Sequence, residues 1–385
     1  MAVHRMILNE TSYFGAGCIS KVPEEITTRG FKKALVVTEQ VLIDAGVSSK
    51  VLKLLDDIKF PYEIFGNFKQ NPTIQNVNDG VAAYKKSGAD LLIAVGGGSA
   101  MDTAKAIGII INNPEFSDVK SLVYEAPTKN ASVPLIAVTT TAGTASEVTK
   151  NYVITDPERK LKFPCVDVHC IPIVAVVDPD LMSKMPKALA AATGMDALTH
   201  AIEGYITKDA WDMTDMMNLK AVELIGRNLR GAVLDKNMEA VTQVAVGQYM
   251  TGMGFSNSGL GIVHSIAHQF GGMYDTPHGV ANAVMLPFIL KYNADYTGSK
   301  YKDIAKAMGV EGTDKMSEAE YRKAAVDSVV SLSKDVGIPQ TLPEIGVKAE
   351  DIPALAIAAF DDGNTPGNPR PTSVKEIEEI LRGAM

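Results

Sequence analysis

Cysteine and histidine are scarce in this chain of 385 residues, which has three cysteines and six histidines. An odd, small number of cysteines in a long chain does not form a disulfide framework, and it indicates a reducing compartment. The first residues, 1–9, lack the apolar core of a signal peptide. We therefore expect a cytoplasmic protein. Four of the six histidines lie within residues 200–278, and this clustering needs an explanation.

Long apolar runs and an excess of positive charge are also missing. The most apolar stretch, 91–111, is interrupted by Gly96–Ser99, Asp102 and Lys105, so it does not supply the roughly 20 apolar residues of a membrane span. The net charge is −8, from 37 basic and 45 acidic residues. Nucleic-acid and anionic-membrane partners normally require a basic patch. We expect neither kind of partner.

The length corresponds to about 2.6 average domains, which favours two. The first half alternates short apolar runs with helical patterns, as in a parallel, doubly wound sheet that is covered on both faces. From Lys187 onward the patterns are almost all helical. The sequence therefore predicts an α/β domain over 1–186 and an all-helical domain over 187–385. The expected strands are 34–38, 62–65, 91–95, 135–138 and 174–177.

A glycine-rich turn, Gly96–Ser99, separates the third expected strand from a helical pattern over 100–111. This order suits a phosphate site, because glycine lets the backbone approach an anion and the first N–H groups of the helix point at it. Ser99 and Asp102 also have the spacing of a capping box. The turn matches neither the G-x-G-x-x-G nor the P-loop lysine motif. Its glycines could equally serve a purely steric purpose.

A second turn, Thr139–Thr144, follows the strand expected over 135–138, and Thr144 and Glu147 again have capping-box spacing. Both turns would lie at the carboxyl ends of parallel strands, where open α/β sheets bind ligands. Glu39, just past the first strand, is placed to accept hydrogen bonds from an adenosine ribose and to repel a 2′-phosphate. Its alternative role is that of a solvated acid at a helix start.

Aspartate and histidine recur at helical spacing in the second half. Asp196 and His200 are four residues apart, as are His264 and His268, and His278 follows shortly after. Residues four apart lie on one face of a helix and can bind one cation together. Three imidazoles and a carboxylate suit Fe²⁺ or Zn²⁺ and disfavour soft-metal chemistry.

Each of these histidines taken alone could be an ordinary core or capping residue. Two pairs and a further histidine in a chain with so few favour a metal site. Five candidate side chains are more than a tetrahedral site that keeps one position for substrate can use, so at least one has another role.

These motifs resemble those of the iron-containing, group III alcohol dehydrogenases, and the resemblance runs essentially from end to end. The turn and helix start Gly96–Lys105 resemble the cofactor motif of that family. The stretches 178–203 and 259–279 resemble its two signatures. The resemblance implies the dehydroquinate synthase-like fold of the family, in which an α/β N-terminal domain with a Rossmann-like parallel sheet precedes an all-α C-terminal domain and the active site lies between them.

The resemblance also implies a role for each candidate residue. It makes Asp196, His200, His264 and His278 the ligands of Fe²⁺, with Zn²⁺ as the alternative metal, and it leaves His268 unligated beside the substrate. NAD is the implied dinucleotide. Its implied neighbours are Gly97, Gly98, Ser99, Asp102, Thr139, Thr140 and Thr144, with Glu39 near the ribose and Asn71, Asn151 and Lys162 completing the cleft.

Within the family, some stretches resemble the branch that interconverts 1,2-propanediol and lactaldehyde, and others resemble the methanol and 1,3-propanediol branches. Two positions depart from the common pattern. Glu39 stands where an aspartate is common, which keeps the acid but changes its reach. Asn364 replaces a frequent cysteine. The stretches that resemble the 1,2-propanediol branch are 200–207, 252–257 and 351–356. Those that resemble the methanol and 1,3-propanediol branches are 268–270 and 139–144.

The expected activity is reversible hydride transfer between a nicotinamide and a small primary alcohol or aldehyde, with the metal as Lewis acid and His268 as proton relay. Butanol dehydrogenase and a zinc glycerol dehydrogenase-like polyol oxidase are alternatives on the same fold. A metallohydrolase would leave two phosphate-type turns unexplained, and no DNA-binding motif supports a sensor. Similarity to the family implies a homodimer or a larger homo-oligomer.

Overall fold

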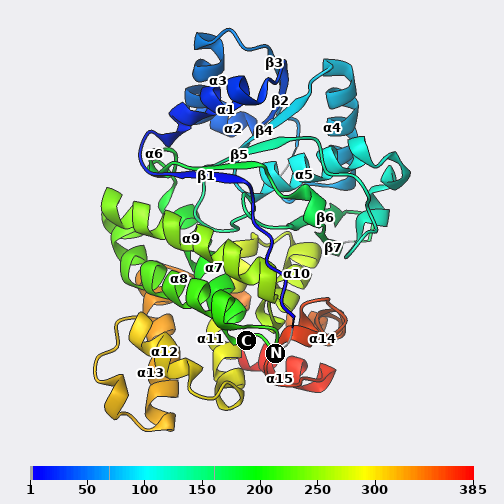
Figure 1. Cartoon of the computed structure of the whole chain (residues 1–385). Helices are drawn as coiled ribbons and strands as arrows, with labels where there is room; N and C mark the ends of the chain where they lie inside the picture. Colours follow the sequence, from blue (N-terminus) through cyan, green and yellow to red (C-terminus); the bar gives the residue numbers. More distant parts are fainter. Residues whose placement is uncertain (1–2, 69, 160) are drawn as a thin grey trace. The chain divides into compact units, whose positions relative to one another are not determined.

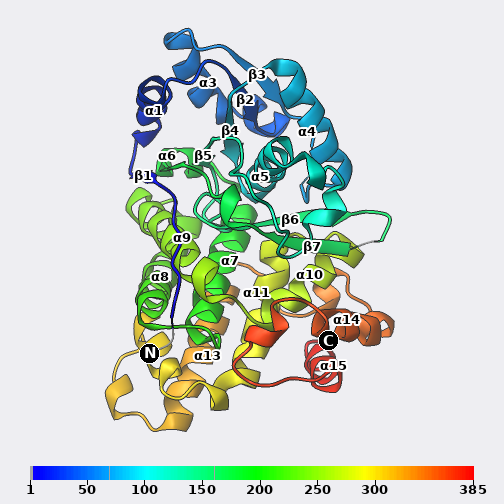
Figure 2. The same cartoon turned by 45° about the vertical axis from the view of Figure 1, so that its right-hand side comes forward.

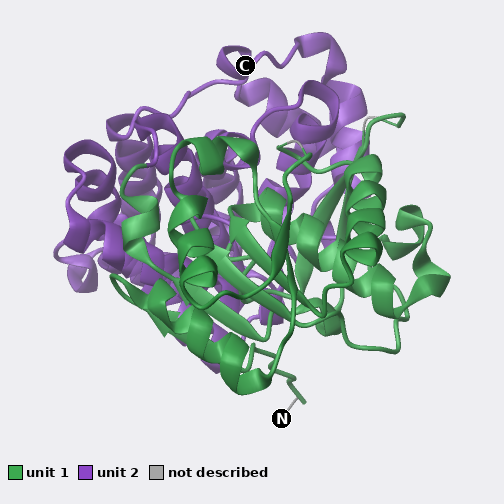
Figure 3. Ribbon diagram, turned by 90° about the horizontal axis from the view of Figure 1, so that it is seen from above, with its two compact units in different colours: residues 1–141, 145–184 green, residues 142–144, 185–385 purple. Residues whose placement is uncertain are grey.

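The computed structural model describes residues 3–68, 70–159 and 161–385. The chain divides into two compact units, which are described separately here (Figure 3). The first unit consists of Met1–Thr141 and Ala145–Lys184, and the second consists of Ala142–Thr144 and Met185–Met385. The short segment 142–144 therefore belongs to the second unit, although it lies within the sequence of the first.

A six-stranded parallel sheet forms the centre of the first unit, with the order β1-β8-β5-β4-β2-β3 (Figure 1). All five strands expected from the apolar runs are present and parallel. The first strand of the sheet, β1, was not predicted; it pairs with β8 at one edge. The strands are β1 (Thr11–Phe14), β2 (Ala34–Val37), β3 (Tyr62–Phe65), β4 (Leu91–Gly96), β5 (Leu135–Thr139) and β8 (Val174–Val177).

Both faces of the sheet are buried at its four inner strands, β2, β4, β5 and β8, which explains the continuous apolar runs of these strands. Alternate residues of a strand point to opposite faces. In β4, Ile93 packs in a cluster with Val51 and Leu55 of α3, whereas Leu92 packs in another with Met101 and other α5 residues. The helices of the first unit are α1 (Val22–Arg29), α2 (Gln40–Asp44), α3 (Ser48–Asp57), α4 (Ile74–Ser87), α5 (Gly98–Asn112) and α6 (Pro179–Met182).

One long helix expected over 40–58 is two helices, α2 and α3. Gly46, between them, adopts a φ of 71°, a left-handed conformation that glycine tolerates and that ends a helix. The glycine signal was present in the sequence, but the apolar spacing continued across it.

An antiparallel hairpin outside the main sheet was not predicted. Its strands are β6 (Asn151–Asp156) and β7 (Leu161–Val166). Tyr152, Ile154 and Phe163 of the hairpin pack against Ile109 of α5 in a cluster of buried side chains. Burial alternates along β6, but neither strand alternates polar with apolar residues in its sequence, so no pattern typical of a strand stood out.

The second unit is helical, as the patterns beyond Lys187 predict. Helices α7, α8 and α9 pack together, and α10 and α11 contact each other, while α11 also contacts α7 (Figure 2). The helices are α7 (Lys187–Ile206), α8 (Asp212–Arg230), α9 (Met238–Ser258), α10 (Ile262–Tyr274), α11 (His278–Asn293), α12 (Lys300–Ala307), α13 (Glu318–Asp335), α14 (Ile352–Phe360) and α15 (Val374–Gly383).

Within the described part of the chain, no helix combines the length and the apolar character needed to cross a membrane.

Candidate active site

Two glycines let the helices of the second unit approach closely where the histidines gather. A Cβ on Gly279, at the start of α11, would lie 2.5 Å from the carbonyl oxygen of Ala192 in α7. A Cβ on Gly261, just before α10, would lie 2.8 Å from Oε1 of Glu203 in α7. Real Cβ atoms do not come this close to other atoms. At position 279 the close atom belongs to the backbone, so only glycine allows α11 to start against α7, whereas at position 261 the side chain of Glu203 would have to move.

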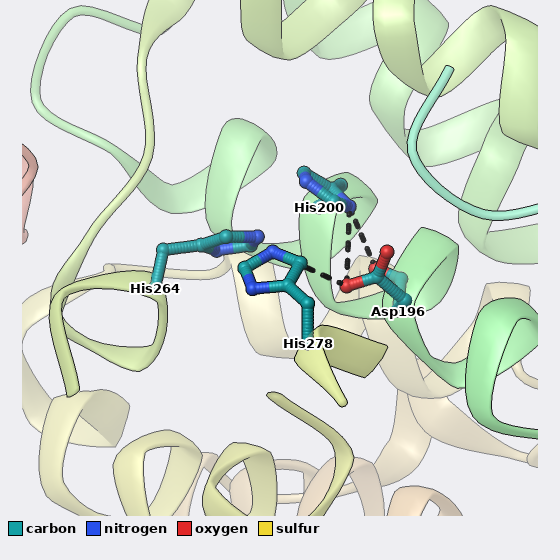
Figure 4. Close-up of side chains that lie close together, drawn as sticks. All are labelled: Asp196, His200, His264 and His278. Atoms are coloured by element: carbon teal, nitrogen blue, oxygen red, sulfur yellow. Dashed lines mark hydrogen bonds and ion pairs between the residues drawn. The ribbon is translucent and has the colours of Figure 1, made fainter. Parts of the chain in front are cut away.

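Asp196 and His200 of α7, His264 of α10 and His278 of α11 converge at this place (Figure 4). One ligand atom from each side chain lies within 4.8 Å of all the others. Asp196, His200 and His264 are buried, and His278 is partly exposed. A tetrahedral cation with ligand bonds of about 2.1 Å has its ligand atoms about 3.4 Å apart, which lies inside this upper limit.

The outer nitrogens of two imidazoles are held by hydrogen bonds within the protein. Nδ1 of His264 lies 2.6 Å from Oε2 of Glu203, and Nδ1 of His200 lies 2.9 Å from the carbonyl oxygen of Asp196. A hydrogen on each Nδ1 leaves the lone pair of Nε2 available for a cation, and such outer contacts are usual for metal-binding histidines. The donor set and its surroundings therefore fit a divalent metal.

Burial shifts the protonation equilibria of these groups. It lowers the pKa of His200, and burial together with three neighbouring imidazoles lowers the pKa of His264 well below its ordinary value. The neutral imidazole, which is the form that binds a cation, is thereby favoured. Burial also raises the pKa of Glu203 to about 7, against the backbone N–H groups of residues 261, 263 and 264 that favour its ionised form.

His268 lies near the four side chains but is bonded to a different partner. Its Nδ1 is 2.8 Å from Oδ2 of Asp362, and both side chains are buried. Its ring stacks on that of His278, with centroids 5.6 Å apart. Burial opposes ionisation of Asp362, but His268 and Asn364 outweigh it and lower the pKa of this carboxyl. The pair places an oriented imidazole beside the ligand set.

Three residues of this site were not singled out from the sequence: Glu203, Asn282 and Asp362. Glu203 is seven residues after Asp196 and Asn282 is four after His278, so helical spacing could have indicated both. Asp362 reaches His268 across 94 positions of sequence, and nothing local marks it. The amide Nδ2 of Asn282 lies 2.7 Å from Oδ1 of Asp196.

In the first unit, the glycine-rich turn and the start of the second turn lie side by side at the carboxyl ends of β4 and β5. Gly96, the last residue of β4, pairs with Thr139, the last of β5, and the N–H of Thr140 donates to the carbonyl oxygen of Gly96. Gly97 is the N-cap of α5, so Gly98 and Ser99 lie in its first turn. A Cβ on Gly97 would lie 3.0 Å from Oγ1 of Thr141. The first turn of α5 therefore begins at two glycines, and a Cβ at position 97 would require the side chain of Thr141 to shift.

The capping box expected from Ser99 and Asp102 is wrong. Gly97 caps α5 without a side-chain bond, and the carboxylate of Asp102 is used elsewhere. It accepts hydrogen bonds from Oγ of Ser146 at 2.9 Å and from the N–H of Val153 at 3.0 Å. Burial raises the pKa of Asp102 to about 6. Asp102 thus holds the chain around β6 against α5.

The helix that the spacing of Thr144 and Glu147 suggested does not form. Residues 144–150 contain turns and no helix, and Ala145 adopts a φ of 51°, a conformation that a helix cannot include. Thr144 itself belongs to the second unit. Within that unit, a Cβ on Gly143 would lie 2.9 Å from Cβ of Thr193 in α7.

The remaining expected cofactor residues lie at the rim of the sheet and in the hairpin. Glu39 precedes α2 as its N-cap and makes no side-chain capping bond; burial raises its pKa. Asn71, with a φ of 61°, accepts a hydrogen bond of 2.7 Å from Nζ of Lys162 in β7. The carbonyl oxygen of Asn151 accepts one of 2.8 Å from the buried Lys105 of α5.

Comparison with known proteins identifies the family. Residues 9–179 match the iron-containing alcohol dehydrogenase model, and residues 190–385 match the model for the C-terminal part of the same family. The chain belongs to the iron-containing alcohol dehydrogenase family. The family expected from the motifs is therefore confirmed.

Individual members of the family cover the whole chain. Lactaldehyde reductase of Escherichia coli (strain K12) is 54% identical over 381 residues, 99% of each chain. NAD-dependent methanol dehydrogenase of Bacillus methanolicus is 40% identical, over 97% of this chain and 98% of its own. The crystal structure of a 1,3-propanediol oxidoreductase superposes with a TM-score of 0.96 at 42% identity, covering 100% of both chains. The expected fold is confirmed by this match.

Proposed function

We propose that this chain reduces lactaldehyde to 1,2-propanediol with NADH and also catalyses the reverse reaction. The lactaldehyde reductase relative supports this substrate, because it resembles the chain from end to end. In the forward reaction, a hydride passes from the nicotinamide to the carbonyl carbon and a proton passes to the carbonyl oxygen. The products are the primary alcohol and NAD⁺.

The observation that carries the proposal is the convergence of Asp196, His200, His264 and His278. Three imidazole nitrogens and one carboxylate oxygen suit Fe²⁺ and also suit Zn²⁺, and the family supports Fe²⁺. A divalent cation at this place supplies Lewis acidity that polarises the aldehyde oxygen. No further acid, such as a carboxyl pair, is then needed to activate the carbonyl.

We assign the proton transfer to and from the substrate oxygen to His268. Asp362 accepts a hydrogen bond from Nδ1 of His268, so Nε2 of this imidazole remains free to exchange a proton. A histidine suits this task because its imidazole can both donate and accept a proton. Asp362 orients the ring, and its lowered pKa keeps it ionised.

For the dinucleotide, the proposed contacts are the start of α5 and the neighbouring turn. The N–H groups beginning at Gly98 and Ser99 suit a pyrophosphate, and Thr139, Thr140 and Thr144 suit the nicotinamide riboside. Asn71, Asn151 and Lys162 are assigned to the rest of this site. Glu39 is assigned to the adenosine ribose, where a carboxylate favours NAD over NADP.

We further propose that the protein acts in the cytoplasm as a homodimer or a larger homo-oligomer, with a small alcohol or aldehyde as substrate and no nucleic-acid or membrane partner. The small number of cysteines supports a cytoplasmic location. The acidic net charge argues against a nucleic-acid partner. Light scattering on the purified protein measures the assembly.

The test is an assay at the NADH absorption band with protein loaded anaerobically with Fe²⁺ or with Zn²⁺. The aldehydes are lactaldehyde, propanal and butanal, and the alcohols are 1,2-propanediol, 1,3-propanediol, glycerol and methanol. The proposal expects the highest kcat/KM for lactaldehyde with NADH, a lower value with NADPH and higher activity with Fe²⁺. A clear preference for 1,3-propanediol or methanol would reassign the substrate to that of the other relatives.

Binding of NADH distinguishes the proposed oxidoreductase from a protein of a different functional class. A hydrolase with the same ligands would not bind NADH, whereas the proposed oxidoreductase quenches or shifts NADH fluorescence on titration. Binding of NADH without turnover of any member of the substrate panel would favour a sensor.

A further inference from the structure

The side-chain amide of Asn282 lies among the atoms assigned to the metal. Its Nδ2 is 2.7 Å from Oδ1 of Asp196, 3.1 Å from Nε2 of His264 and 3.0 Å from Nε2 of His278. Asn282 is fully buried in α11, one turn after His278. Three of the four groups assigned as ligands are therefore in hydrogen-bond contact with one amide nitrogen.

This contact determines which ring nitrogens carry hydrogen. An asparagine Nδ2 only donates, so Nε2 of both histidines must accept. The bond from Nδ1 of His264 to Glu203 requires the same tautomer of that ring. The amide thus favours the tautomer whose Nε2 lone pair a cation uses. Its two hydrogens serve three acceptors, so at least one bond is shared.

The other end of the amide does not explain why this polar side chain is buried. Oδ1 of Asn282 has no hydrogen-bond partner among the described residues. A buried, unpaired amide oxygen is unfavourable, so the bonds that offset it are those of Nδ2 to the ligand set. Asn282 therefore differs from an ordinary core asparagine, which is bonded at both ends.

The hydrogen bonds of Asn282 and coordination by His264 and His278 use the same lone pairs. A nitrogen that binds a cation through its one lone pair cannot also accept a hydrogen bond there, whereas the carboxylate of Asp196 has further lone pairs. We propose that Asn282 is a positioning residue that holds three ligand atoms together and then gives up the two histidines to the arriving cation. This inference rests on the proposed metal site.

The proposal has a thermodynamic consequence. Asn282 stabilises the cation-free protein through contacts with three groups, but the cation-loaded protein through Asp196 alone. Replacing the amide of Asn282 must then destabilise the cation-free form more than the cation-loaded form. By linkage, the variant binds the cation more tightly than wild type does. Two hydrogen bonds released on binding correspond to an affinity change of about tenfold.

The experiment compares wild type with Asn282→Leu, which keeps the volume, and with Asn282→Ala in case leucine prevents folding. Each full-length protein is stripped with a chelator. The dissociation constant of Zn²⁺ is then measured by competition with a chromophoric chelator, and the thermal unfolding midpoint is measured with and without Zn²⁺. Both variants are expected to bind Zn²⁺ about tenfold more tightly and to show a larger rise of the midpoint on Zn²⁺ addition.

Asn293→Leu is the matched control. Asn293 is buried in the same helix, but its amide exchanges hydrogen bonds with Asn368 at 2.9 Å in each direction. Its loss should lower both midpoints equally and leave the Zn²⁺ affinity unchanged. Unchanged or weaker Zn²⁺ binding by the Asn282 variants overturns the proposal, while the metal site itself stands. A wild-type protein that binds no stoichiometric Zn²⁺ overturns the proposed metal site and this inference together.

Discussion

Glu203 and His264 join two helices at the candidate metal site, with Oε2 of Glu203 2.6 Å from Nδ1 of His264 and both side chains buried. Glu203 also accepts the N–H of Val263 at 2.8 Å, so one carboxylate fixes the start of α10 and the imidazole on it. Glu203→Ala should therefore weaken Zn²⁺ binding by about 10- to 100-fold. Competition with a chelator measures the change.

The control for this prediction is Glu223→Ala. Glu223 is a partly exposed residue of α8 that pairs with Lys220, and its loss should leave Zn²⁺ affinity unaltered. If Glu203→Ala and Glu223→Ala bind Zn²⁺ equally well, the carboxylate does not orient His264.

The pair of His268 and Asp362 makes a second prediction. His268→Ala should lower turnover by about 100-fold, the contribution typical of a general acid, while the metal content stays at the wild-type value. Asp362→Asn should cause a smaller loss and alter the pH profile of kcat, because the imidazole remains but its orientation changes. Steady-state kinetics and metal analysis on the same samples check both. Wild-type turnover by His268→Ala would remove this residue from the mechanism.

Gly279 makes a prediction about packing. A Cβ there would meet the carbonyl oxygen of Ala192 at 2.5 Å, so Gly279→Ala must push α11 and His278 away from α7. We expect a loss of about 1–3 kcal/mol in the free energy of unfolding and weaker Zn²⁺ binding. Urea denaturation measures the first. Gly383→Ala is the control, because its Cβ would meet nothing within 4 Å. Equal stability of the two variants would contradict the claim that glycine is needed for α11 to approach α7.

Asp102 predicts a pH dependence of stability. Burial raises its pKa from 3.8 to about 6, so between these values the folded protein holds a proton that the unfolded chain has lost. This contribution to stability falls as pH rises through that window. Asp102→Asn lacks the titration. Relative to wild type, it should gain roughly 3 kcal/mol between about pH 4 and about pH 7, at about 1.4 kcal/mol for each pH unit.

Urea denaturation of both proteins at the two pH values measures this difference. A difference that stays constant with pH would mean that Asp102 titrates normally in the folded protein.

Much of the fold and of the candidate ligand set follows from local patterns. The buried runs of the parallel strands predicted the sheet, because both of its faces are covered. Helical spacing placed Asp196 above His200 on α7, and few histidines elsewhere made the cluster stand out. The glycines before α5 marked the start of that helix correctly, although the wrong residues were expected to cap it.

Other features depend on contacts between distant segments. Asp362 bonds to His268 across 94 positions, and the carboxylate of Asp102 turns away from the helix start because Ser146 and Val153 compete for it. The β6–β7 hairpin packs its buried side chains on α5, which no local periodicity reveals. These contacts arise from the tertiary structure, and no pattern along the chain indicates them.

The central claim is that Asp196 and the three histidines hold the cation that turnover requires. The most direct measurement compares wild type with Asp196→Asn and His264→Ala after anaerobic Fe²⁺ loading and gel filtration, recording bound iron per chain and NADH oxidation with lactaldehyde on the same samples. The account predicts that wild type retains one iron per chain and turns over, while both variants lose iron and activity together. Stoichiometric iron and normal turnover in either variant would contradict it.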